Sequence, residues 1–188
     1  KMQDIELTAT LSTAKEWAKK MKEGGVDITS CYQCGKCSAG CPMASAMDYS
    51  PRQVVRLLQL GVADEALRSR SIWLCASCET CATRCPRDVD VAKMMDILRI
   101  ESDRAGVAAL PHIPIFHKTF LESVENHARV AETELMMKFN MRSGKLFNNV
   151  DLGPKMMQKG KLHVFAPKVE GGQAVKKIFA RVREMGVD

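Results

Sequence analysis

The chain has 188 residues, of which 46% are apolar, 27% charged and only 5% aromatic, and its formal net charge is +6. This length allows one domain, or one domain with an extension, and the apolar share excludes an intrinsically disordered chain. The sequence has no run of about 18 apolar residues that could span a membrane, and no charged-then-apolar leader opens it. We therefore expect a cytoplasmic protein without a membrane segment, in a compartment where disulfides are rare.

The excess positive charge lies in the last third of the chain. Residues 1–128 carry 16 Lys and Arg against 16 Asp and Glu, whereas residues 129–188 carry 12 against 6. These basic residues form no dense cluster and have little aromatic interleaving, which is typical of the solvated faces of amphipathic helices. No nucleic-acid partner is expected.

Helical patterns dominate, and strand signals are nearly absent. A first helix is expected over residues 12–23, where Gly24-Gly25 ends it. Ser50, Pro51 and Gln53 form a capping-box pattern at the start of a helix over residues 51–60. Further helices are expected over residues 63–68, 90–106, 115–125, 130–141 and 173–185, with Pro111 and Pro114 breaking the chain and only residues 162–165 extended. The predicted fold class is all-α.

Twelve methionines are a high number for this length, and several lie in the distal half. Core packing is the favoured interpretation of each of them. The alternative is an adaptable docking surface for other subunits, because methionine is flexible and polarizable. The distal methionines are Met136, Met137, Met141, Met156 and Met157.

All eight cysteines fall into two runs with the same spacing, C-x2-C-x2-C-x3-C-P. The first run is Cys31, Cys34, Cys37 and Cys41, and the second is Cys75, Cys78, Cys81 and Cys85. This spacing is typical of bacterial-type [4Fe–4S] binding, in which the fourth cysteine serves the other cluster. Three sulfurs three residues apart can converge on one cubane, and the proline that follows each run turns the chain away.

The sequence therefore predicts two [4Fe–4S] clusters with interleaved ligands. One cluster is assigned to Cys31, Cys34 and Cys37 together with Cys85, and the other to Cys75, Cys78 and Cys81 together with Cys41. Such an exchange keeps the clusters close and joins two segments that 33 residues separate, so cluster binding should be coupled to folding. Because those 33 residues carry helical patterns, the scaffold should be the helical variant of a two-cluster ferredoxin.

Three other uses of the cysteines fit the spacing less well. A disulfide framework needs an oxidising compartment and would be sterically poor at such short spacing. A zinc-stabilised interaction module is the alternative of another class, but zinc knuckles are usually a dozen or more residues apart. A thioredoxin-like dithiol lacks the βαβ pattern that normally surrounds it.

The residues around the runs resemble the C subunit (HdrC type) of the heterodisulfide reductases of methanogenic archaea. The resemblance rests on Ser-Cys-Tyr-Gln-Cys-Gly-Lys-Cys from Ser30 and Trp-Leu-Cys-Ala-Ser-Cys-Glu-Thr-Cys from Trp73. The segment Arg-Leu-Leu-Gln-Leu-Gly that ends at Gly61 and the segment Phe-Ala-Pro-Lys-Val from Phe165 extend it. It is close over residues 28–100 and loose beyond residue 110.

The resemblance implies a non-catalytic electron-transfer subunit of an oxidoreductase complex. In that family, the HdrC-type protein takes electrons from a flavin- and iron–sulfur-containing A subunit and passes them to the B subunit, which reduces the CoM-S-S-CoB heterodisulfide. Some such complexes include a hydrogenase or formate dehydrogenase module and bifurcate electrons. An iron–sulfur subunit of a related thiol/disulfide or quinone oxidoreductase is the alternative within the same class.

The sequence also predicts a domain organisation and a set of charges that tune the clusters. We expect an N-terminal helical extension over residues 1–27, the two-cluster domain over residues 28–108 and a C-terminal helical region for subunit docking over residues 109–188. The basic residues near the runs, expected either to raise cluster potentials or to be ordinary surface charges, are Lys36, Arg84, Arg87 and Lys93.

Overall fold

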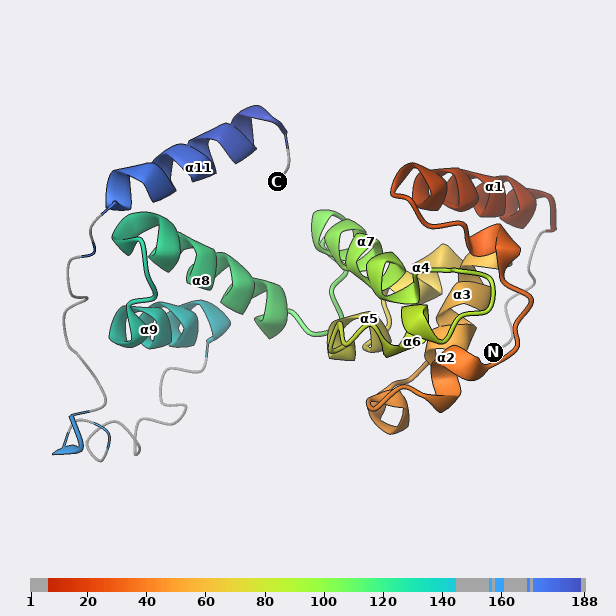
Figure 1. The fold of residues 1–188 in the computed structure, drawn as a ribbon, viewed down its shortest axis with the longest axis horizontal. Helices are drawn as coiled ribbons and strands as arrows, with labels where there is room; N and C mark the ends of the chain where they lie inside the picture. The colour runs from red at the N-terminus through yellow and green to blue at the C-terminus, as the bar shows by residue number, and fades with distance from the viewer. Residues whose placement is uncertain (1–6, 145–155, 157, 161–168, 170, 187–188) are drawn as a thin grey trace. The chain divides into compact units, whose positions relative to one another are not determined.

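The computed structural model describes residues 7–144, 156, 158–160, 169 and 171–186, and the chain divides into two compact units at Leu110. Every regular element among these residues is a helix, which confirms the predicted all-α class (Figure 1). The first unit contains α1 (Leu7–Glu23), η1 (Ile28–Ser30), α2 (Lys36–Ala39), η2 (Ala44–Ala46), α3 (Pro51–Gln59), α4 (Ala63–Leu67), α5 (Ser71–Leu74), α6 (Thr80–Thr83) and α7 (Val91–Arg104). The second contains α8 (His112–His127), α9 (Glu132–Ser143) and α11 (Gly172–Glu184).

The core of the first unit lies between α3 and the helices around it. α1 and α4 pack against α3, and α4, α5 and α6 pack against α7. Each fully buried apolar side chain contributes about 1.5–3 kcal/mol relative to its exposure. The largest such side chains are Met21, Ile28, Leu58, Ile72, Met94, Met95 and Leu98.

The predicted start of α3 is confirmed in detail. The side-chain oxygen Oε1 of Gln53 accepts hydrogen bonds from the backbone N–H of Ser50 at 2.9 Å and from the Ser50 hydroxyl at 2.8 Å. Pro51 occupies the first helical position, where its missing N–H would have no intrahelical partner. The same local logic holds at α7, where the Asp90 carboxylate accepts from the N–H of Lys93 at 2.9 Å.

The prediction that both prolines break the distal chain is wrong for Pro114. Pro111 stands just before α8, but Pro114 lies inside the first turn of that helix. A proline is tolerated there because the first N–H groups of a helix have no carbonyl partner within it. α8 therefore begins earlier than expected and ends at His127, where Ala128 adopts a left-handed conformation.

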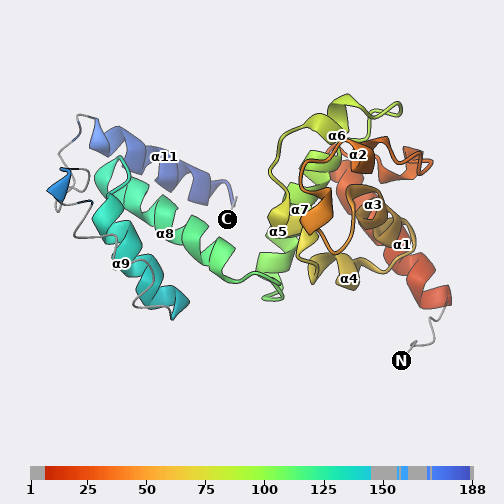
Figure 2. The ribbon, with the colours of Figure 1, turned by 90° about the horizontal axis from the view of Figure 1, so that it is seen from below.

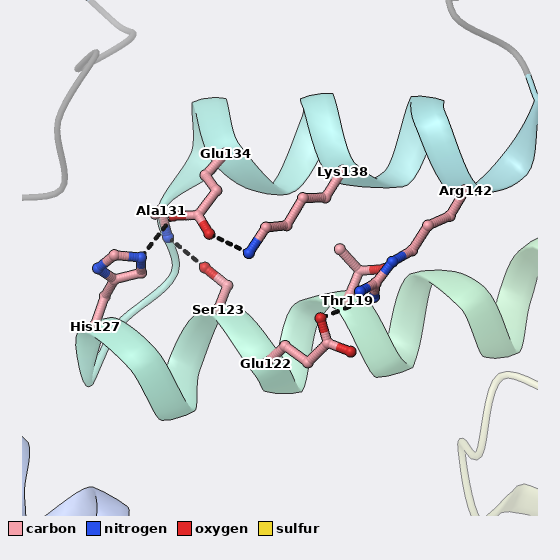
Figure 3. Close-up of polar contacts among 8 residues, drawn as sticks. All are labelled: Thr119, Glu122, Ser123, His127, Ala131, Glu134, Lys138 and Arg142. Carbon is pink, nitrogen blue, oxygen red and sulfur yellow. Dashed lines mark hydrogen bonds and ion pairs between the residues drawn. The ribbon is translucent and has the colours of Figure 1, made fainter.

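The second unit is organised around the pair α8 and α9, which pack side by side (Figure 3). The buried N–H of Ala131 donates to the hydroxyl of Ser123 at 2.9 Å, which ties the start of α9 to α8. Along the same interface Arg142 pairs with Glu122 at 2.8 Å. Glu134 contacts both His127 and Lys138, so the two helices are joined by polar contacts along their length.

The core interpretation of the distal methionines is wrong for the four whose side chains are described. Their exposed fractions are 40% for Met136, 62% for Met137, 67% for Met141 and 38% for Met156. On α9 the buried position belongs to Leu135, so the methionines occupy the remaining faces of the helix. Met157 and the segment 162–165, predicted to be extended, lie outside the described residues.

Within the described ranges, none of the helices combines the length and apolar character that crossing a lipid bilayer requires.

Candidate iron–sulfur site

The two cysteine runs adopt the same backbone conformation. The residue before the second cysteine has a positive φ in both runs, 65° at Gln33 and 48° at Ser77. The residue after that cysteine does as well, with 86° at Gly35 and 61° at Glu79. A short helix then carries the third cysteine, in α2 and in α6. Because non-glycine residues rarely adopt positive φ, the repeat of this loop indicates a conformation that the site requires.

The two loops are packed against each other. α2 and α6 are in contact, as Figure 2 shows for the first unit. A side-chain carbon added at Gly40 in the first run would lie 2.6 Å from the guanidinium of Arg84 in the second. Cys37 and Cys81 lie close enough for their charges to interact. The packing therefore brings sulfurs from distant parts of the sequence into one site.

A pocket beside the second run includes a cysteine of the first. Cys75, Cys78 and Cys81 line it together with Cys41. Among the described residues, no three His, Cys, Asp or Glu side chains converge closely enough to hold a single metal ion. Four thiols around one pocket are the donor set that an iron–sulfur cubane prefers.

Apart from Thr80, the other residues that line this pocket are apolar. Met43 and Met47 follow the first run, whereas Val91 and Met95 come from α7. Met95 and Val91 are buried, so α7 forms a rigid wall. Such surroundings exclude water from a bound group, which strengthens every electrostatic interaction with it.

Cys85, the last cysteine of the second run, lies close to the first run. The charges of Cys34, Cys85 and Arg87 all act on the hydroxyl of Tyr32, which lies in the first run. The backbone N–H of Val89 donates to Sγ of Cys85 at 3.2 Å. Cys41 thus lines the pocket of the second run, and Cys85 lies within electrostatic range of Tyr32 in the first.

The thiols differ in burial and in pKa. Burial raises the pKa of the half-buried Cys37, and it raises the pKa of Cys81 to about 11. A hydrogen bond with the Thr80 hydroxyl, 3.4 Å from Sγ, lowers the pKa of the exposed Cys78. A half-buried thiolate has lost part of its hydration, so a bound cationic group would compensate for that loss at Cys37 and Cys81. None of the eight cysteines forms a disulfide.

Three polar side chains that support the loops have no signal in the sequence. The Asp48 carboxylate accepts from the N–H groups of Arg70 at 2.8 Å and Ser71 at 2.9 Å, which holds the segment after the first run against α5. Gln33 and Gln59 are hydrogen-bonded to each other and to Cys31. Apart from the short step from Gln33 to Cys31, these contacts join residues 22 to 28 positions apart, so no local pattern announces them.

The predicted tuning charges occupy different places. Arg84 lies against Gly40 between the loops, and Arg87 acts on Tyr32 beside the first run. Lys93 reaches toward Gly25 at the end of α1. Lys36 is exposed at the start of α2.

The comparisons with known proteins agree with this geometry. Residues 27–89, which include all eight cysteines, match the 4Fe-4S dicluster domain family. This match confirms the expectation of two [4Fe–4S] clusters.

Relatives of the chain are found among methanogenic archaea. The C subunit of the H(2):CoB-CoM heterodisulfide,ferredoxin reductase of Methanothermobacter thermautotrophicus is 35% identical over 99 residues, which cover 52% of this chain and 54% of the relative. The iron-sulfur C subunit of the CoB--CoM heterodisulfide reductase of Methanopyrus kandleri is 36% identical over 91 residues, 48% of this chain and 47% of the relative.

A third relative, the C2 subunit of the H(2)/formate:CoB-CoM heterodisulfide,ferredoxin reductase of Methanococcus maripaludis, is 42% identical over 85 residues, 45% of this chain and 46% of the relative. The chain thus spans about half the length of the curated relatives it matches. These relatives are subunits of an oxidoreductase complex and confirm the resemblance drawn from the sequence. Residues 27–89 thus match the 4Fe-4S dicluster domain family, and about half of the chain is similar to the HdrC-type subunits of heterodisulfide reductases.

Proposed function

We propose that this chain is the electron-transfer subunit of a heterodisulfide reductase complex. It takes electrons from a flavin- and iron–sulfur-containing A subunit and passes them through two [4Fe–4S] clusters to the B subunit, which reduces the CoM-S-S-CoB heterodisulfide. A hydrogenase or formate dehydrogenase module is a further partner, in line with the name of the Methanococcus relative. The observation that carries the proposal is the presence of Cys41 in the pocket of the second run.

The ligand sets of the proposal are interleaved. Cys31, Cys34 and Cys37 hold one cluster with Cys85, and Cys75, Cys78 and Cys81 hold the other with Cys41. Support comes from the pocket that Cys41 shares with the second run and from the effect of Cys85 on the hydroxyl of Tyr32 in the first. All eight thiols are then occupied as ligands, so none is left to attack a disulfide.

The role of the protein is to bind the clusters, to exclude water from them and to set their reduction potentials. A bound [4Fe–4S] cluster takes up and releases one electron at a time. The interleaved loops keep the two sites adjacent, while Met43, Met47 and Met95 exclude water from one of them. Hydrogen bonds from the N–H of Val89 to Cys85, and between Thr80 and Cys78, stabilise the ligating sulfurs. Cys34 and Cys78 are exposed, so a docked partner could approach each cluster at that edge.

The proposal includes a cytoplasmic location. Eight thiols that serve as cluster ligands must stay reduced until iron and sulfide are loaded, and the cytoplasm keeps them so.

Iron content tests the cluster assignment. The full chain purified without oxygen should be brown, absorb near 400 nm and contain about eight Fe per chain, four in each cluster. The Cys41→Ala and Cys85→Ala variants should each retain about four Fe. Met43→Leu, a change of similar volume in the same pocket, is the matched control and should keep the wild-type iron content. Zinc in place of iron would instead support an interaction module.

Thiol alkylation of the same variants tests which cysteines share a cluster. In Cys41→Ala, loss of the second cluster should expose Cys75, Cys78 and Cys81 to iodoacetamide, and peptide mass spectrometry would identify them. If Cys31, Cys34 and Cys37 were alkylated instead, each run would hold its own cluster and the interleaving would be refuted.

Purification from the native source tests the role in the complex. The chain should co-purify with a flavoprotein and with a second protein that contains adjacent cysteine pairs. Recovery of the chain as a free ferredoxin would contradict the proposed complex.

A further inference from the structure

A chain of side-chain amides runs from the end of α3 to the first cysteine. The amide nitrogen of Gln59 lies 2.9 Å from the carbonyl oxygen of Ile28 and 2.9 Å from that of Cys31. Since both neighbours are acceptors, the NH₂ group of Gln59 must face them and its oxygen must face the other way. That oxygen lies 3.2 Å from the amide nitrogen of Gln33. The orientation of Gln33 is therefore set by chemistry.

Gln33 uses both of its N–H groups. One donates to Gln59, and the other is directed at Sγ of Cys31, with 3.6 Å between nitrogen and sulfur. The oxygen of Gln33 is buried, and no described residue offers it a hydrogen bond. A buried acceptor without a partner is unfavourable, so Gln59 holds Gln33 in an orientation that a free amide would not choose.

The backbone at Gln33 points to the same conclusion. Its φ of 65° lies in the left-handed region, which glycine adopts at a lower conformational cost than glutamine does. Glycine does occupy the next such position of this loop, Gly35, with φ 86°. A glycine at position 33 would fit the loop equally well but would remove the only side-chain amide that donates to Sγ of Cys31 among the described contacts.

The second run lacks this arrangement. Its matching residue, Ser77, has a shorter side chain, and its hydroxyl accepts a hydrogen bond from Arg99 at 2.8 Å. No described contact joins Ser77 to Cys75. The side-chain contact to a sulfur of the second run is instead the one between Thr80 and Cys78. The amide chain is thus specific to the first run.

We propose that Gln33, oriented by Gln59, is a positioning residue that donates a hydrogen bond to the Cys31 thiolate and raises the reduction potential of the cluster held by Cys31. An N–H directed at a ligating sulfur withdraws negative charge from the cluster, and the reduced state, which carries one more electron, gains more from this than the oxidised state. The inference rests on the proposed function for the presence of the cluster. It makes the two clusters inequivalent through a side chain present in only one run.

A redox titration of the full chain, followed by electron paramagnetic resonance without oxygen, tests the inference. In Gln33→Leu, one of the two reduction steps should move to a lower potential while the other stays at its wild-type value. Gln33→Glu keeps the size of the side chain but removes the N–H donor and adds negative charge, so it should move the same step further down. Gln59→Leu should shift that step in the same direction, because Gln33 loses its orienting partner.

The matched control is Ser77→Ala, which changes the corresponding residue of the second run and should leave the step assigned to the first cluster unchanged. If Gln33→Leu and Gln33→Glu both load eight iron atoms and titrate at wild-type potentials, the inference is overturned while the proposed function stands. If Gln33→Leu loses iron, the test rests on the similarly shaped Gln33→Glu, whose reduction potentials then support or overturn the inference. A wild-type chain without iron would instead overturn the proposed function.

Discussion

Gly61 is the position at which a single added carbon should disturb the first unit most. It follows α3 in a left-handed conformation with φ 73°, its N–H donates to Leu58, and the next N–H, of Val62, donates to Leu57 at 2.9 Å. This pattern closes a helix with the Schellman motif. A side-chain carbon at Gly61 would lie 1.9 Å from the carbonyl oxygen of Thr10 in α1. The obstacle is backbone, which cannot rotate out of the way.

The expected loss of stability in Gly61→Ala has two parts. Placing alanine in the left-handed region costs about 1–2 kcal/mol. Overpacking against α1 costs a further ~1–3 kcal/mol, because the start of α1 must move away from α3. Gly106→Ala separates the two parts, since Gly106 has φ 67° but no atom within 4 Å of its added carbon. The control should therefore show only the first cost.

The measurement is urea denaturation of the oxygen-free protein followed by far-ultraviolet circular dichroism, with wild type, Gly61→Ala and Gly106→Ala compared under the same conditions. We expect the free energy of unfolding to fall in both variants and to fall about 1–3 kcal/mol further in Gly61→Ala. Equal losses in the two variants would refute the close approach of α1 to the end of α3.

Three further predictions concern single side chains. Burial alone would raise the pKa of Asp48, but hydrogen bonds from Ser71 and nearby N–H groups keep this pKa below its usual range. The stability that the Asp48 carboxylate contributes should therefore be lost as pH falls through the lowered pKa. Asp48→Asn should cost about 1 kcal/mol at neutral pH and weaken the fall of the melting temperature in acid, measured by thermal denaturation across pH. Ser123→Ala leaves the buried N–H of Ala131 without its acceptor and should cost about 1–3 kcal/mol in thermal denaturation, and an unchanged midpoint would contradict that bond. Arg84→Gln should lower the potential of at least one cluster in a redox titration, and unshifted steps would remove Arg84 from the residues that tune the clusters.

Local features of this protein could be predicted well from the sequence. The cysteine spacing predicts the cofactor, because a cubane needs thiolates at short, regular intervals along one loop. The capping box at Ser50 predicts the start of α3, because its partners are three residues apart and their hydrogen bonds do not depend on the rest of the fold. The expected resemblance to HdrC-type subunits of heterodisulfide reductases depends on the same loops and was confirmed by the comparisons.

Predictions from the sequence were wrong where a residue fitted two local interpretations and contacts with distant residues decided between them. Pro114 has the pattern of a helix breaker, but its place in the first turn of α8 removes the conflict. Met137 and Met141 fit a core pattern equally well, yet Leu135 takes the buried position on α9 and leaves them exposed. The interleaved ligand sets and the domain boundaries stay predictions, and the iron and alkylation experiments address the ligand sets.

The chemistry that the protein can support follows from its residues alone: eight thiols in two runs, between helices whose ends depend on neighbouring residues. Which distant groups come into contact depends on the packing of the helices. That packing brought Cys41 to the second run, set Gln59 to orient Gln33 and placed Gly61 against α1. The physical reason is that spacing along the chain governs contacts within a turn or a helix, whereas contacts across tens of residues follow from how whole helices bury their apolar faces.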